Sequence, residues 1–359
     1  MPRLPDAMEG ETIKNPPTGF PVYATGRRPR VISADVWSFL RHVAETELPE
    51  RKGRVAVAFI EQAAEFYDAA ANPRIGSRPL LYYYSFMNLA KAFLLVRRVD
   101  LPPAPRHGIS DPRANVKRRL RLEGQAVRFS RCATDHSELF PEFVKTLGMD
   151  VQRPRTVRLL SLLRQVPGIH RAFCRVTRER CSFMPAERFE LRRAKNQVYA
   201  RMVVLRHDQD VLETLPQIRV RRAFRRIFHQ VASPNAQELW FETEPVPGAT
   251  RATDTAIRQL SARVCKVGIW PILTDKGQKC YLSTIPPREW LPPLASIYAI
   301  MFYLGSITRY KPYDFDRIVA GRFTWLIGEF LKTQPAQFVY GVAAHAAGVD
   351  VVRPYALLE

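Results

Sequence analysis

The sequence lacks the short motifs that mark several large classes of enzyme. It contains no G-x-x-x-x-G-K-[ST] phosphate loop, no G-x-G-x-x-G dinucleotide fingerprint, no H-E-x-x-H zinc helix and no G-x-S-x-G nucleophile elbow. Signatures of RNA-recognition domains and zinc fingers are absent as well. These absences argue against the common nucleotide-hydrolysing, dinucleotide-dependent, zinc-protease and serine-hydrolase functions.

Cysteine and long apolar runs are also scarce. The five cysteines include no C-x-x-C pair and no cysteine–histidine zinc pattern, so we expect reduced structural thiols, a cytoplasmic location, and no metal or cofactor. The N-terminal residues 1–21 have no apolar core of the kind found in signal peptides. The most apolar stretch, residues 294–307, is shorter than the ~20 residues of a membrane span, which predicts a buried helix and no membrane partner.

Acidic residues and lysine are few, whereas arginine is abundant. The 359 residues carry 34 Asp+Glu against 55 Lys+Arg, a net charge of +21, and 44 of the basic residues are arginine. This excess favours an anionic partner, which we expect to be RNA, DNA or a nucleotide, with an acidic protein as a further option. A GC-rich codon bias is the alternative explanation, and it leaves the basic surface without a function.

The pattern of elements predicts an α+β fold with mainly helical N- and C-terminal parts packed together and a smaller β-containing insert between them. We place an extended arm at 1–32, a mainly helical part with a Tyr-rich central helix at 33–175, a β-rich insert with a basic helix at 176–286, and a helical part at 287–359. The 46% hydrophobic content is sufficient for a packed core.

Several element boundaries can be predicted from local signals. Ser33 is a candidate N-cap for a first helix, and Pro79 suits the first turn of the Tyr-rich helix. Residues 136–147 and 156–165 have a helical pattern, residues 115–131 and several segments of the insert have strand patterns, and 275–277 is a hairpin-type turn.

Three segments resemble the YaaC-like family of bacterial proteins. They are RPLLYYYSFMNLAKAFLL (78–95) followed by His107-Gly108, LLSLLRQVPGIHRAF (159–173) and GSITRYKPYDF (305–315). The resemblance covers most of the chain after about residue 30. It implies a bacterial cytosolic protein whose matching motifs lie close in space, and it carries over no catalytic residue.

Polar residues inside these apolar motifs are the candidate ligand-binding residues. Tyr84, Asn88 and Lys91 share one helix face at i, i+4 and i+7, where Lys91 can bind phosphate and Tyr84, or Tyr83 beside it, can stack or donate a hydrogen bond. The alternative is that Asn88 and Lys91 tie helices together by structural hydrogen bonds.

Two loop or helix-end motifs complete the candidate pocket. His107, next to a glycine, can act as an acid, as a base or as a hydrogen-bond donor to phosphate. The alternative is a loop histidine that bonds to the backbone. Arg309 and Tyr310 follow an apolar helix, so Arg309 either grips an anion or caps the helix carbonyls, and Tyr310 can stack.

A dense basic stretch, RVRRAFRRIFHQ, predicts an amphipathic helix that can track a phosphate backbone or present an ordinary solvated face. Its candidate nucleic-acid-binding residues are Arg219, Arg222, Arg225 and Arg226. Arg-x4–6-His pairs, similar to the motif of HEPN-type ribonucleases, occur at Arg131/His136, Arg164/His170, Arg201/His207 and Arg222/His229.

Together these features predict a nucleic-acid- or nucleotide-binding protein rather than an enzyme. We expect it to serve in a bacterial multi-protein system of the phage-defence type, a hypothesis drawn from the type of protein and not from particular residues. A metal-independent ribonuclease with an Arg/His pair is one alternative, and a structural partner protein without enzymatic activity is the other.

Overall fold

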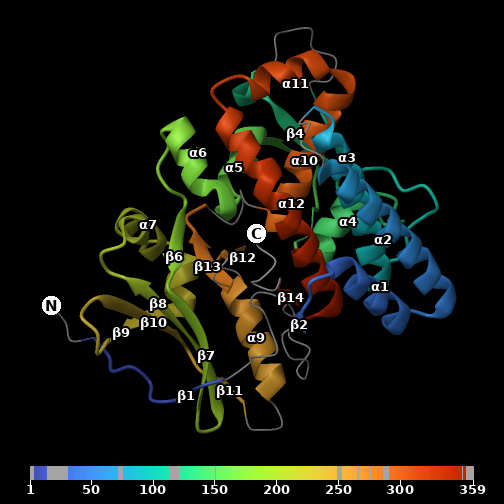
Figure 1. Cartoon of the computed structure of the whole chain (residues 1–359). Coiled ribbons are helices and arrows are strands. Elements are labelled where there is room, and N and C mark those ends of the chain that lie inside the picture. Colours follow the sequence, from blue (N-terminus) through green and yellow to red (C-terminus); the bar gives the residue numbers. More distant parts are fainter. Residues whose placement is uncertain are drawn as a thin grey trace. The chain divides into compact units, whose positions relative to one another are not determined.

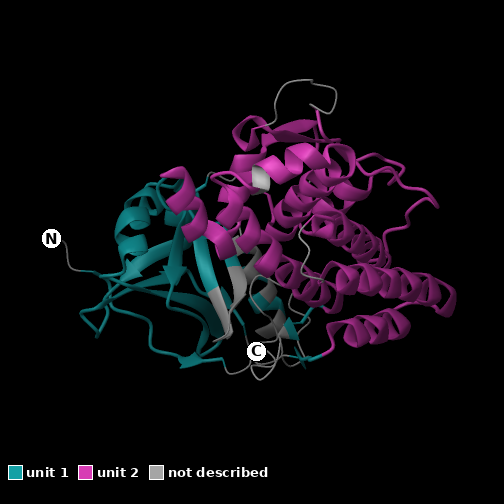
Figure 2. Cartoon of the chain, turned by 45° about the horizontal axis from the view of Figure 1, so that its top comes forward, with its two compact units in different colours: residues 1–34, 179–290, 348–359 teal, residues 35–178, 291–347 magenta. Residues whose placement is uncertain are grey.

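The computed structural model describes residues 4–13, 31–71, 76–112, 121–149, 151–248, 253–265, 267–274, 277–285, 291–349 and 351–352. The chain forms two compact units, each made of segments that are distant in sequence (Figure 2). Unit 1 comprises Met1–Ala34, Glu179–Trp290 and Gly348–Glu359, and unit 2 comprises Asp35–Arg178 and Leu291–Ala347. Unit 2 unites the two predicted helical parts, which confirms the predicted α+β fold.

Unit 2 is mainly helical, with one small sheet (Figure 1). Its elements are α1 (Val36–Glu47), α2 (Glu50–Ala71), α3 (Arg78–Val96), β3 (Ile109–Ser110), η1 (Leu122–Gly124), β4 (Ala126–Phe129), α4 (Leu139–Thr146), β5 (Arg155–Arg158), α5 (Leu159–Arg164), η2 (Pro167–Ile169), α6 (His170–Thr177), α10 (Pro293–Tyr310), α11 (Pro312–Val319) and α12 (Thr324–Ala347). The strands pair antiparallel in the order β3-β4-β5.

Helix α3 is the centre of unit 2 because it is apolar on nearly every side. It packs against α2, α10 and α12, so a helix from near the start of the chain is covered by two from near its end. Phe86 of α3 stacks on Phe338 of α12 with 3.9 Å between ring centroids, and Phe143 of α4 lies 5.9 Å from Phe338. Such aromatic pairs contribute roughly 0.5–1.5 kcal/mol beyond the area they bury.

Gly305 permits the close approach of α10 to α3. A Cβ atom at this position would lie 3.0 Å from Tyr83 Cβ and 3.1 Å from the carbonyl oxygen of Pro79. Since both atoms belong to the α3 backbone region, they have little freedom to move away. Gly305, in the motif at 305–315, therefore allows close packing against the motif at 78–95.

Unit 1 is built on an antiparallel sheet in the order β1-β7-β8-β10-β9, with β11 also paired to β8. A second sheet has the order β12-β13-β6, and β2 pairs parallel with β14. The elements are β1 (Glu11–Thr12), β2 (Val31–Ile32), β6 (Phe183–Ala186), β7 (Arg188–Ala194), β8 (Gln197–Leu205), α7 (Gln209–Arg219), α8 (Arg222–Ile227), β9 (Phe228–Val231), β10 (Glu238–Thr243), β11 (Val246–Pro247), α9 (Thr253–Cys265), β12 (Ile269–Thr274), β13 (Gly277–Ser283) and β14 (Val351–Val352).

A buried ion pair lies in the main sheet of unit 1. Arg201 of β8 is directly opposite Glu242 of β10, and its Nε donates to the Glu242 Oε1 at 2.7 Å. The two side chains are 5% and 0% exposed, and the guanidinium also lies 4.1 Å from the centroid of the Trp240 ring. Arg201 is thereby held as a structural residue.

Several predicted boundaries were wrong. Asp35, not Ser33, caps α1, because its carboxylate accepts from the backbone N–H groups of Trp37 and Ser38 at 3.0 Å. Residues 155–158 are a strand, since they pair with β4, and the helix starts only at Leu159. The basic helix is limited to residues 222–227, because the chain then joins the sheet as β9.

The terminal segments also differ from the prediction. Residues 11–12 of the extended arm pair with β7, and residues 351–352 of the predicted helical end pair with β2. The predicted strand over 115–131 is confirmed at 126–129, whereas 115–120 lie outside the described residues. Strands β12 and β13 form the expected hairpin, and Asp275 and Lys276 of its turn lie outside the described residues.

The apolar stretch at 294–307 lies within α10 and is buried, as predicted. Among the described helices, none combines the length and the apolar character needed to cross a membrane.

Replacing Gly305 by alanine is expected to lower the free energy of unfolding by about 1–3 kcal/mol, because the added methyl group collides with α3. Gly328→Ala is the matched control, since this exposed glycine of α12 has open space around its Cβ position. The control is expected to gain about 0.5–1 kcal/mol from helix propensity. Urea denaturation of both variants checks the pair, and equal effects would contradict the packing argument.

Replacing Arg201 by methionine is expected to lower the free energy of unfolding by about 3–5 kcal/mol, because Glu242 is left buried without its cation. The double variant R201M/E242L is expected to recover most of this loss. Arg222→Met, at an exposed arginine of the same unit, is the control and is expected to change stability by less than about 0.5 kcal/mol. Chemical denaturation followed by circular dichroism measures all three, and an R201M variant as stable as R222M would refute the role of the pair.

Acid is expected to destabilise unit 2 through His345 of α12. Burial, and secondly the charge of Arg97, lower the pKa of His345 from 6.5 to about 4. Below pH 6.5 the unfolded chain takes up a proton that the folded chain excludes, so the stabilisation falls as the pH drops from 6.5 to 4, by up to about 3 kcal/mol. His345→Asn should flatten this part of the stability profile. The exposed His42→Asn should leave it unchanged, and an unaltered profile in both variants would overturn the assignment.

Candidate functional site

The Tyr-rich helix and the His107 loop meet at a hydrogen bond. The Tyr83 hydroxyl lies 2.9 Å from His107 Nδ1, and the Tyr83 ring packs edge-on against Phe302 of α10 at 5.4 Å. Burial raises the pKa of Tyr83, so its phenol stays protonated at neutral pH. A phenol that donates to Nδ1 leaves the ring proton of His107 on Nε2, where it can be donated to a ligand.

Two cations lie near His107. Burial is the main cause that lowers the pKa of this histidine, and the positive charges of Lys91 and Arg309 lower it further. Lys91 is half-buried, with its ammonium 5.1 Å from the Phe59 ring centroid, and burial lowers its own pKa. Arg309 donates from Nη1 to the Tyr84 hydroxyl at 2.9 Å. The result is a neutral imidazole beside two positive charges.

We call Tyr83, Tyr84, Lys91, His107 and Arg309 the His107 cluster. Within the part of the chain that the structure describes, neither cation of the cluster has a carboxylate at ion-pair distance. Lys91 is half-buried and Arg309 is exposed, and positive charges that the protein does not neutralise attract an anion. The cluster can therefore bind an anionic group through charge-assisted hydrogen bonds.

Two of the six predicted ligand-binding residues have other roles in this arrangement. Asn88 is buried, and its amide donates to Gln62 Oε1 of α2 at 2.8 Å, which is the helix-tying alternative. Tyr310 is 68% exposed, and its ring lies under the Arg309 guanidinium at 5.0 Å. The other four predicted residues, Tyr84, Lys91, His107 and Arg309, belong to the cluster.

The predicted basic residues of unit 1 divide into two kinds. Arg219 bonds to the Gln230 amide oxygen and lies over the Phe241 ring at 5.7 Å. Arg222, Arg225 and Arg226 of α8 are exposed and make no ion pair with any described residue. Their guanidinium groups are free to meet phosphate.

None of the four Arg/His pairs lies on a single described helix. His170 is buried, with Nδ1 2.5 Å from the Pro167 carbonyl oxygen, and Arg201 is held in its ion pair with Glu242. His229 is in β9, whereas Arg222 begins α8. The ribonuclease alternative stays a prediction, without the helical geometry on which the motif depends.

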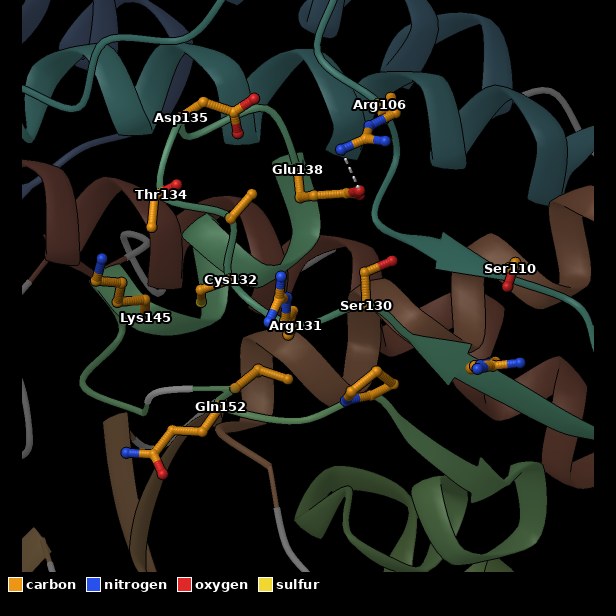
Figure 3. Close-up of a pocket in the computed structure, with 14 residues that line it drawn as sticks. Arg106, Ser110, Ser130, Arg131, Cys132, Thr134, Asp135, Glu138, Lys145 and Gln152 are labelled. Carbon is orange, nitrogen blue, oxygen red and sulfur yellow. Dashed lines mark ion pairs between the residues drawn. The ribbon is translucent and has the colours of Figure 1, made fainter.

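The sequence reasoning missed a pocket beside the small sheet of unit 2 (Figure 3). Its volume is about 910 Å³. It is lined by Arg106, Ser110, Arg128, Ser130, Arg131, Cys132, Ala133, Thr134, Asp135, Glu138, Lys145, Val151, Gln152 and Pro154. These residues come from β3, from β4, from α4 and from the loops around them, so no local motif predicts the pocket. The only available signal was the density of arginine and hydroxyl residues around the predicted strand.

The family model for YaaC-like proteins matches residues 31–346. No curated protein and no solved structure matches the chain significantly. The matched region contains every residue of the His107 cluster, and it brings together the motifs at 78–95 and 305–315 that carried the resemblance. The chain therefore belongs to the YaaC-like family.

Proposed function

We propose that unit 2 binds a phosphate-bearing ligand, either a nucleotide or a strand of nucleic acid, at the His107 cluster. The observation that carries the proposal is the pair of cations, Lys91 and Arg309, beside a neutral histidine without a carboxylate to neutralise them.

The chemistry of the cluster suits phosphate. A guanidinium can hold two phosphate oxygens at once, an ammonium supplies a compact positive charge, and an imidazole N–H adds a directed hydrogen bond. Tyr83 and Tyr84 fix His107 and Arg309 from α3, so these groups are held in place before a ligand arrives. Little conformational entropy is then lost on binding.

Unit 1, taken by itself, carries exposed arginines that suit a ligand with many phosphates, such as a strand of nucleic acid. Arg222, Arg225 and Arg226 are exposed together on one short helix. A ligand with many phosphates can engage several such groups, and each contact releases counterions. Binding of such a ligand would also give the net charge of +21 a function.

We further propose a cytoplasmic binding protein, not an enzyme, that works in a bacterial multi-protein system of the phage-defence type. This proposal can be tested by mass spectrometry of the nucleotides, nucleic acids and proteins that co-purify with the native chain. Recovery of the chain without any anionic or protein partner would count against it.

The double variant K91M/R309M is expected to weaken binding of a labelled single-stranded RNA at least about tenfold, because two charge-assisted contacts are lost. The slope of log K against log salt should become shallower by about 1.4, since each phosphate contact contributes roughly 0.7 for a single strand. Fluorescence anisotropy across a salt series measures both quantities. Calorimetry with ATP tests whether the cluster binds a nucleotide.

Lys332→Met is the matched control, because Lys332 is an exposed lysine of α12 outside the cluster. It should bind RNA like the wild type. Circular dichroism and a thermal melt establish that K91M/R309M is folded. If the folded double variant binds RNA and ATP as the control does, the cluster is not the phosphate site.

A further inference from the structure

The pocket beside the small sheet is a separate place where the protein can hold a ligand. Its volume of about 910 Å³ lies within the range of small-molecule sites, roughly 300–1,000 Å³. None of the members of the His107 cluster lines it. The pocket and the His107 cluster therefore have no residue in common.

The sheet supplies one wall of the pocket. Ser110 of β3 is paired with Arg128 of β4, so the two side chains lie on the same face. Ser130 follows two residues later along the chain and also lines the pocket. Val127 and Phe129, on either side of Arg128 in the chain, are buried, which fixes the strand that carries Arg128.

The loop that precedes α4 supplies the opposite wall. Arg106 is bonded through its backbone N–H to the Ser137 carbonyl at 2.7 Å, and its carbonyl accepts from the Leu139 N–H at 2.8 Å. The neighbouring Gly108 has a φ of +68°, and a Cβ atom there would collide with the Pro141 ring. These contacts hold the wall in one conformation.

The charges of the pocket leave two arginines available. Arg106 is paired with Glu138 at 3.0 Å, the dashed ion pair in Figure 3, and Lys145 lies 3.9 Å from the buried Glu142. The side chains of Arg128 and Arg131 make no ion pair or hydrogen bond with any described residue. Two free guanidinium groups in one pocket suit a doubly charged phosphate.

The remaining polar groups suit hydroxyls. Ser110, Ser130 and Thr134 can each donate and accept, and the carboxylates of Asp135 and Glu138 accept. The described lining contains no aromatic ring on which a nucleobase could stack. This combination favours a ligand that is rich in hydroxyls over one with a flat base.

We propose that this pocket binds a phosphorylated sugar or similar polyol phosphate, with the phosphate on Arg128 and Arg131 and the hydroxyls on the serine, threonine and carboxylate groups. No chemical step is involved. The site gives the YaaC-like chain a small-molecule ligand besides the phosphate-bearing ligand of the His107 cluster.

Calorimetry with the full chain tests the proposal with ribose 5-phosphate, glucose 6-phosphate, glucose and inorganic phosphate as probes. At least one sugar phosphate is expected to bind saturably with a Kd of about 1 mM or tighter, and at least about tenfold tighter than either glucose or inorganic phosphate. Absence of saturable binding by both sugar phosphates would overturn the proposal. Equal affinity for inorganic phosphate would overturn the recognition of hydroxyls.

The variants Arg128→Gln and Arg131→Gln are each expected to weaken binding of the sugar phosphate at least about tenfold, because each loses a charge-assisted contact. The control is Arg158→Gln, an exposed arginine of the neighbouring strand β5 that does not line the pocket. If folded R128Q and R131Q bind the sugar phosphate as R158Q does, the ligand lies elsewhere. The variant K91M/R309M should retain sugar-phosphate binding, which separates a failure of this site from a failure of the His107 cluster.

Discussion

The burial of α3 on nearly all sides is the constraint on which unit 2 depends. A helix without a polar face has to be covered by other helices, and the cover comes from α2 and from α10 and α12, more than 190 residues further along the chain. Gly305 allows the close approach of α10, and the Phe86–Phe338 stack fixes the contact with α12. In the sequence, the β-rich segment Glu179–Trp290 is thus inserted between the two halves of one helical core.

The same packing creates the polar cluster. Residues on α3 and at the end of α10 reach the rim of the core, where buried aromatic rings meet solvent. Tyr83 and Tyr84 connect the apolar core to the polar cluster. The ring of each packs against other aromatic rings, and the hydroxyl of each forms a hydrogen bond with a polar partner, His107 or Arg309. Lys91 is partly desolvated by burial, and its ammonium lies near the Phe59 ring. The cluster therefore forms where polar side chains of α3 and of the last turn of α10 lie at the edge of the apolar core.

The arginines do several different things, although the sequence presents them as one uniform excess. Arg201 neutralises a buried carboxylate, Arg309 is fixed by a tyrosine, and Arg106 is paired with Glu138. Others, such as Arg128 and Arg222, are left without a partner among the described residues. Only the arginines that no carboxylate neutralises, among them Arg309, Arg128 and Arg222, remain able to bind an anion, so net charge overstates the surface available to an anion.

The sequence by itself determined the element types, the α+β class and most of the polar cluster, because these follow from local periodicity and from polar residues in apolar helices. It singled out Tyr84, Lys91, His107 and Arg309 as candidates, and the structure brings these four residues together. It misjudged Asn88, since a buried amide can be satisfied by a helix neighbour, Gln62, that no local pattern identifies. Only the tertiary structure decided which cations are neutralised, that residues 11–12 and 351–352 add to sheets, and that loops around β4 enclose a pocket. Each of these depends on contacts between residues far apart in the chain, whose pairing local propensity does not encode.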